Sequence, residues 1–93
     1  MTVQELLSTP NRWTQGTLAR ASDGRKVSPE HPEAVAWCLV GAVLRCYGHD
    51  GLRCGDIIQK LTSMIPEESI PHWNDSRGRT WDEVIELARR VNI

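Results

Sequence analysis

The apolar residues are most concentrated in the middle of the chain. The longest apolar run extends from Ala34 to Leu44. Its hydrophobic residues recur at intervals of three and four positions, which is the spacing of one helix face. The members of this stripe are Val35, Cys38, Leu39, Ala42, Val43 and Cys46. Because further apolar residues cover the other sides, we expect a buried central helix that begins at Pro29 or Pro32 and runs to about Tyr47.

Capping residues predict three further helices. Thr2 and Glu5 have the spacing of a capping box, in which a hydroxyl and a carboxylate each accept a hydrogen bond from a backbone N–H. Thr80 and Glu83 repeat this spacing, and Asp50 can cap a helix with its own apolar stripe. The pattern therefore predicts a short N-terminal helix, a helix after Asp50 and a C-terminal helix.

A small β-hairpin is predicted before the central helix. Side chains alternate roughly in polarity from Trp13 to Arg20, residues 22–24 favour a turn, and residues 25–27 form the predicted returning strand. The elements together indicate a mainly α fold of the α+β class. We expect one compact domain over residues 1–93, built around the buried helix, because 93 residues is an ordinary size for a single core.

Charge and composition narrow the classes of function. The chain has 11 Lys and Arg residues against 12 Asp and Glu residues, so no overall positive field attracts nucleic acid or an anionic membrane. The longest apolar run is about half of what a bilayer span needs, and no targeting signal is recognisable. Three cysteines, an odd number, fit a reducing compartment better than a disulfide framework. We therefore expect a soluble cytoplasmic protein.

The connection from Pro71 to Thr80 is the richest in chemically active groups. It combines an indole with amide, carboxylate and guanidinium groups just before a predicted helix N-terminus, a position that favours anions. The structural alternative is that Asn74 or Asp75 forms a turn, Gly78 adopts a positive φ and Thr80 caps the helix. The candidate ligand-binding residues, which include one from the hairpin region, are Trp13, Trp73, Asn74, Asp75, Arg77, Arg79 and Thr80.

The chain has four tryptophans and no phenylalanine. Trp37 and Trp81 fall on apolar stripes, so we expect them in the core. Trp13 and Trp73 have polar neighbours, so we expect them on a partly exposed face. Two exposed tryptophans that lie together would mark a binding surface.

Four short motifs run from residue 13 to residue 80. They are Trp13-Thr14-Gln15-Gly16, Trp37-Cys38 with Gly41-Ala42, Trp73-Asn74-Asp75, and Gly78-Arg79-Thr80. Their order and spacing resemble a family of small, uncharacterised bacterial and phage proteins that is known only as a domain of unknown function. The resemblance implies no activity. It does imply that Trp13, Cys38, Trp73, Asn74 and Asp75 belong to one group.

Cys38 raises the possibility of catalysis. With His72 and either Asn74 or Asp75 it would supply a nucleophile, a base and an orienting group, as in cysteine-dependent hydrolases and transferases. In the middle of a buried helix, however, the thiol would lie far from the helix N-terminus, and burial raises a thiol pKa. We therefore predict that Cys38 packs in the core, and we assign no catalytic residue.

No metal or cofactor is predicted. Cys46, His49 and Cys54 lack the paired ligand spacing of a zinc site. The functional prediction is a small binding or regulatory module whose recognition surface lies near Trp13 and the Trp73–Thr80 loop. Its expected partner is an unknown protein or a small anionic ligand, and neither nucleic acid nor a membrane. Two alternatives stay open, the cysteine-dependent enzyme and a homodimeric interaction protein.

Overall fold

A computed structural model describes residues 1–93 and contains five α-helices, one short 3-10 helix and a small sheet. The helices are α1 (Val3–Leu6), α2 (Leu39–Tyr47), α3 (Gly51–Ser63), α4 (Ile70–Asn74) and α5 (Trp81–Val91), with the 3-10 helix at Pro10–Arg12. The strands are β1 (Ala19–Ala21), β2 (Lys26–Val27) and β3 (Ala34–Trp37). The fold is therefore α+β, as predicted.

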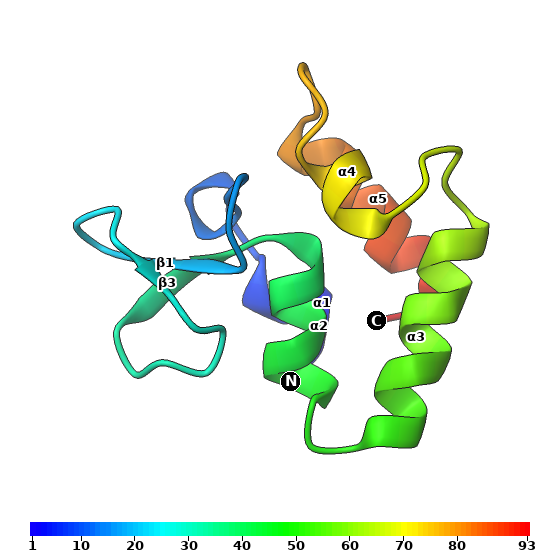
Figure 1. The fold of residues 1–93 in the computed structure, drawn as a ribbon, viewed down its shortest axis with the longest axis horizontal. Helices are drawn as coiled ribbons and strands as arrows, with labels where there is room; N and C mark the ends of the chain where they lie inside the picture. The colour runs from blue at the N-terminus through cyan, green and yellow to red at the C-terminus, as the bar shows by residue number, and fades with distance from the viewer.

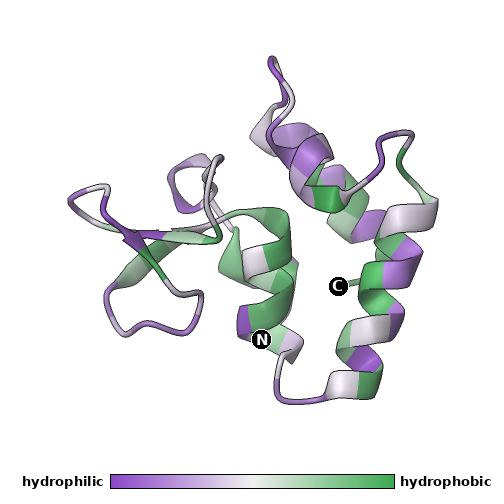
Figure 2. Cartoon of the chain, in the orientation of Figure 1, coloured by the Kyte–Doolittle hydropathy of each residue, from purple (hydrophilic) through white to green (hydrophobic).

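Helix α2 lies at the centre of the molecule. Figure 1 shows the sheet on one side of α2 and α3 on the other. Helix α4 lies at the top of this view, and α5 starts behind α4 and runs down toward α3. Helix α2 contacts α1, α3 and α4, while α5 contacts α1 and α3. In the hydropathy view α2 is apolar along most of its length, whereas α3 alternates between apolar and polar residues (Figure 2). The predicted buried central helix is therefore present, but it is shorter than predicted. No helix has the length and apolar character needed to cross a membrane.

The beginning of the central helix was predicted wrongly. Residues 34–37 form strand β3, which pairs antiparallel with β1, and β1 also pairs antiparallel with β2. Helix α2 starts only at Leu39, with Cys38 as its N-cap. Strand β1 provides hydrogen-bond partners for the backbone of residues 34–37. Val35 and Trp37 also favour a strand, because β-branched and aromatic residues suit a pleated sheet. The apolar spacing of this segment was compatible with both structures.

The predicted capping residues are confirmed. The Thr2 hydroxyl accepts from the Glu5 N–H at 3.1 Å, and the Thr80 hydroxyl accepts from the Glu83 N–H at 3.3 Å. Both glutamates bond back to the N-cap N–H at 2.9 Å, so both capping boxes are complete. Asp50 caps α3 by accepting from a backbone N–H at 3.1 Å.

Helix α4 was not predicted. The segment from Pro71 to Thr80 was expected to be one connection, but its first part continues a helical turn that starts at Ile70. The Ser69 hydroxyl caps this turn by accepting from the His72 N–H at 3.3 Å. A serine followed by a proline in the first turn is the local pattern that indicates such a start. The remaining connection turns at Gly78, whose φ of 87° is the predicted positive value.

Candidate functional site

Asn74, at the end of α4, is completely buried and joins three segments of the chain. Its carboxamide oxygen accepts from the Trp13 indole N–H at 2.8 Å and from the Leu39 backbone N–H at 3.0 Å. Its amide nitrogen donates to the Thr14 carbonyl at 3.2 Å and to the Asp75 carboxylate at 2.9 Å. A carboxamide has two acceptor sites and two donors. Asn74 therefore has no hydrogen-bonding capacity left for a ligand.

Three further hydrogen bonds extend this arrangement along the same segments. The Gln15 side chain donates to the Asn74 carbonyl at 2.9 Å and to the Ser76 carbonyl at 3.3 Å, and the Gly16 N–H donates to the Asp75 carboxylate at 3.0 Å. We call the residues Trp13, Thr14, Gln15, Gly16, Asn74 and Asp75 the Asn74 network. The network holds the segment before β1 against the end of α4, so two of the sequence motifs lie side by side.

Cys38 lines a small cavity beside the network. The cavity has a volume of about 200 Å³ and is lined by Gly16, Thr17, Leu18, Cys38, Pro71 and Asp75. The Cys38 sulfur accepts from the Gly41 N–H at 3.3 Å, so the residue caps α2. The predicted position in the middle of the helix was wrong. Burial nevertheless raises the pKa of the Cys38 thiol, and the nearby Asp75 carboxylate acts in the same direction. The expected burial of Cys38 is present.

Of the other members of the hypothetical catalytic group, only Asp75 lines the Cys38 cavity. His72 is exposed on α4 and does not line the Cys38 cavity. The Asn74 carboxamide is fully engaged in the network. His72, the predicted base, is therefore not beside the Cys38 sulfur, and the Asp75 carboxylate that does line the cavity raises the pKa of the thiol. No three His, Cys, Asp or Glu side chains lie close enough together to hold a metal ion.

The arginines of the predicted anion site differ in their surroundings. The Arg79 guanidinium lies over the Trp73 ring at 4.0 Å, donates to the Trp73 carbonyl at 2.9 Å, and pairs with Glu83 at 3.1 Å. A second carboxylate, that of Glu67, lies 3.7 Å away. Arg77, by contrast, is exposed. Arg79 is thus held by the fold, and Arg77 is the free guanidinium of this connection.

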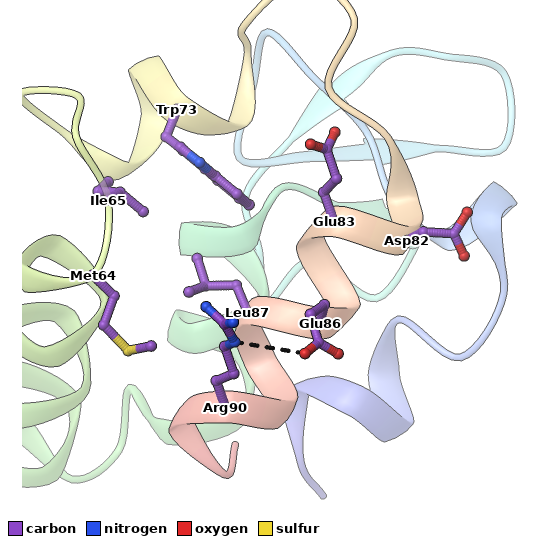
Figure 3. A pocket seen from close by; sticks show the side chains of 8 residues that line it. All are labelled: Met64, Ile65, Trp73, Asp82, Glu83, Glu86, Leu87 and Arg90. Atoms are coloured by element: carbon purple, nitrogen blue, oxygen red, sulfur yellow. Dashed lines mark ion pairs between the residues drawn. The ribbon is translucent and has the colours of Figure 1, made fainter.

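The largest cavity is lined by Trp73 and by one face of α5. It has a volume of about 410 Å³, and we call it the α5 groove; its lining residues are Met64, Ile65, Trp73, Asp82, Glu83, Glu86, Leu87 and Arg90. Figure 3 shows Trp73 and Ile65 facing Leu87 across the groove, with Glu83, Glu86 and Arg90 along α5. The side chain of Asp82 projects outward at the far end (Figure 3). An apolar floor with a charged rim is the usual composition of a binding site.

The rim of the α5 groove carries three carboxylates and one guanidinium, that of Arg90. Glu86 lies 3.6 Å from Arg90, the ion pair drawn in Figure 3. A hydrogen bond from Arg89 lowers the pKa of Glu86, and the hydrogen bond from the Thr80 backbone lowers the pKa of Glu83. Both glutamates are therefore ionised at neutral pH. Among the side chains that line the groove, carboxylates outnumber guanidiniums by three to one, while Arg79 and Arg89 pair with Glu83 and Glu86 from outside the lining.

Trp73 differs from the other tryptophans in its indole N–H. The indoles of Trp13, Trp37 and Trp81 donate to Asn74, to the Pro29 carbonyl and to the Leu7 carbonyl, each at 2.8 Å. The Trp73 indole makes no hydrogen bond within the chain. Its nitrogen is nevertheless not among the fully enclosed polar atoms that lack a partner, so it has some contact with solvent. Trp73 thus offers a free donor from a side chain that is only 7% exposed.

The placement of the tryptophans was predicted only in part. Trp37 is buried, as expected, but Trp73 is buried as well, and Trp13 and Trp81 are half-buried. The floor residues Met64, Ile65 and Leu87 were not among the candidate site residues. Their relation to Trp73 depends on how α3, α4 and α5 pack together. The spacing of Glu83, Glu86, Leu87 and Arg90 on one face of α5 is the sequence pattern that could have pointed to them.

Comparisons with known proteins give one match. A family profile matches residues 2–92, and the family is described as one of unknown function. No curated protein and no solved structure matches the chain.

Proposed function

The chain belongs to a family of unknown function, DUF6197, and we propose that it is a small binding module whose recognition surface is the α5 groove. The observation that carries this proposal is the free indole N–H of Trp73, a nearly buried side chain in the wall of the largest cavity. Solvent reaches this N–H, so in the free protein water is its only available acceptor. A ligand with a hydrogen-bond acceptor would satisfy it.

The size and lining of the groove support the same choice. Its volume of about 410 Å³ is within the usual range of ligand sites, whereas the Cys38 cavity has about half that volume. The apolar floor offers burial of a ligand's hydrophobic group, which is the main favourable contribution to most association. In the Asn74 network the carboxamide is fully paired within the fold, so the network offers less to a ligand.

This proposal narrows the recognition surface expected from the sequence. Of the predicted surface, Trp73 lies in the groove, while Trp13, Asn74 and Asp75 belong to the network on the other side of α4. A cysteine-dependent activity has less support, since the pKa of the Cys38 thiol is raised and His72, the predicted base, does not line its cavity. A cytoplasmic location and a bacterial or phage origin remain predictions from the sequence.

A neutral aromatic probe tests the groove directly. Benzyl alcohol has an apolar ring and a hydroxyl that can accept from the Trp73 N–H. We expect its addition to shift the NMR signals of the Trp73 indole N–H and of the Ile65 and Leu87 amides. Shifts confined to the Asn74 network or the Cys38 cavity, or scattered over the surface, would contradict the proposal.

A matched pair of substitutions supplies the control. Met64 and Leu52 are both exposed apolar residues at opposite ends of α3, 43% and 87% exposed respectively, and Met64 alone lines the groove. Met64→Lys should weaken the response of the Trp73 indole to benzyl alcohol, because a charged side chain replaces part of the apolar floor. Leu52→Lys should leave the response unchanged.

A further inference from the structure

We infer that the occupant of the α5 groove is a positively charged, amphipathic segment of a partner protein, an inference that rests on the proposed function. Such a segment combines apolar side chains, Lys or Arg side chains and backbone carbonyl groups. The groove presents a complement to each of these three groups. The three complements lie on one face, in the wall formed by α4, α5 and the end of α3.

The first complement is the apolar floor. Ile65 and Trp73 face Leu87, and the more exposed Met64 adds to this apolar lining (Figure 3). An apolar side chain of the partner can pack against these residues and leave water. Burial of this kind supplies most of the affinity in peptide-binding grooves, in which a few anchor side chains occupy a hydrophobic channel.

The second complement is the Trp73 indole N–H. Its acceptor in the free protein is water, whereas its three counterparts in this protein all have an oxygen acceptor within the chain, in two cases a backbone carbonyl. A peptide carries a carbonyl at every residue, so an apolar anchor on the floor brings an acceptor with it. An aliphatic ligand without an oxygen would bury this donor unpaired, at a cost in affinity.

The third complement is the charge of the rim. Glu83 and Glu86 line the groove, and their partners Arg79 and Arg89 do not, so the groove itself has three carboxylates against the one guanidinium of Arg90. A cation in the partner finds ionised carboxylates along the first half of α5. Exposed ion pairs are weak and are screened by salt. Charge therefore decides which peptide is preferred, while the floor provides most of the binding.

The length of the groove suits a short peptide segment. Its lining residues on α5 extend from Asp82 to Arg90, eight positions along the helix. At a rise of 1.5 Å per residue this face is about 12 Å long. Roughly three or four residues of extended peptide, or two turns of a helix, span this distance. The anionic ligand considered from the sequence has less support here, because the lining has three carboxylates and one guanidinium.

Three synthetic peptides of twelve residues test the inference. They share one amphipathic pattern of leucines and carry Lys, Gln or Glu at every polar position. Binding is followed by NMR through the Trp73 indole and the groove amides, at low and at high salt. We expect the Lys peptide to bind roughly threefold to tenfold more tightly than the Gln peptide, and the Glu peptide most weakly. The preference should shrink at high salt.

A matched pair of variants separates the groove from the overall charge. Glu86 and Glu33 are both exposed glutamates in ion pairs with arginine, and only Glu86 lines the groove. Glu86→Gln should abolish most of the preference for the Lys peptide, whereas Glu33→Gln should preserve it. An equal effect of the two variants would overturn the inference, since attraction would then follow net charge alone.

The outcomes distinguish this inference from the proposed function. If all three peptides shift the groove signals with equal affinity, the groove binds segments without regard to charge: the inference fails and the binding module stands. If none of the peptides shifts the Trp73 indole and benzyl alcohol does not either, both fail. If benzyl alcohol shifts it and the peptides do not, the groove takes a small ligand and the inference alone is overturned.

Discussion

The two sides of α4 show opposite uses of neighbouring residues. Asn74 faces the network, where each side-chain donor and acceptor site is paired within the protein. Trp73, one residue earlier, lines the α5 groove, and its indole N–H has no partner in the chain. A dense polar motif can therefore be the part of a protein that has least to offer a ligand. Unsatisfied capacity, rather than the number of polar residues, marks the candidate site.

The closed hydrogen bonding of the Asn74 network suits so small a domain. A chain of 93 residues buries a smaller fraction of its surface than a larger one, so links between distant segments matter more. Asn74 joins the segment before β1, the start of α2 and the end of α4. Substitutions in the network should therefore affect folding, and substitutions in the groove should not.

The largest effect is expected for Asn74→Ala. The change leaves the Trp13 indole N–H and the Leu39 N–H without their acceptor and removes a buried side chain. Each unpaired buried group costs about 1–3 kcal/mol, so we expect a loss of roughly 3–5 kcal/mol in the free energy of unfolding. Urea denaturation measures it.

Asn11→Ala is the matched control, because Asn11 is exposed and bonds only locally to Thr9. We expect it to change stability by less than about 0.5 kcal/mol. If Asn74→Ala does not fold, Trp13→Phe removes only the indole donor and provides a milder test of the same network. Equal stability of the Asn74 and Asn11 variants would remove the structural role assigned to the network.

The next effect concerns the contact between α2 and the segment before β1. A Cβ atom at Gly41 would lie 1.9 Å from the Leu18 carbonyl oxygen, whereas one at Gly55, in α3, would meet no atom within 4 Å. Gly41→Ala should cost about 2–3 kcal/mol because backbone has to move. Gly55→Ala should instead stabilise the protein by about 0.5–1 kcal/mol through helix propensity. Thermal unfolding of the pair decides, and a neutral Gly41→Ala would contradict the close packing at this helix start.

A smaller effect is expected in the reactivity of Cys38. The thiol is buried and its pKa is raised, whereas Cys54 is only half-buried. Iodoacetamide should therefore label Cys38 at least about tenfold more slowly than Cys54 between pH 5 and 9, as read by peptide mass mapping. Rapid labelling of Cys38 with a low apparent pKa would make a thiol enzyme the better hypothesis.

The same raised pKa predicts a pH dependence of stability. Above an ordinary thiol pKa of about 8.5 the unfolded chain releases the Cys38 proton while the folded protein retains it. The contribution of this group to stability is complete below that pH and is lost as the pH rises further. Cys38→Ala should have a flatter stability profile above pH 8.5 in urea denaturation; an unchanged profile would argue against the raised pKa.

The smallest effect on the fold is expected at the groove itself. Met64 is 43% exposed at the end of α3, so Met64→Lys should change the free energy of unfolding by less than about 0.5 kcal/mol. Urea denaturation beside Leu52→Lys measures this. A loss as large as that of Gly41→Ala would mean that Met64 is part of the packed core and that the floor is not available to a ligand.

Local chemistry made most helix ends predictable from the sequence. The capping boxes at Thr2 and Thr80 and the cap at Asp50 depend on residues at most three positions apart, and all three are present. The strand over residues 34–37 depends instead on its pairing with β1, about fifteen residues earlier in the chain. Apolar spacing alone does not distinguish such a strand from a helix, so the central helix was predicted too long.

The candidate site was less predictable for the same reason. The partners of Asn74 lie 61 and 35 positions away, at Trp13 and Leu39, and nothing in the sequence near Asn74 identifies them. The family resemblance implied that Trp13, Cys38, Trp73, Asn74 and Asp75 form one group. In the structure Trp13, Asn74 and Asp75 share the network and Cys38 lines the cavity beside it, whereas Trp73 lines the α5 groove. The free donor of Trp73 is defined by the absence of a partner, which only the folded arrangement reveals.

The most direct test of the account is the exchange of the four indole N–H groups with water, observed in one series of NMR spectra of the protein without ligand. We expect Trp13, Trp37 and Trp81 to be protected, because each donates to an oxygen within the protein. Trp73 should exchange much faster. Protection of Trp73 equal to that of the others would contradict the free donor in the α5 groove, and rapid exchange of Trp13 would contradict the closed Asn74 network.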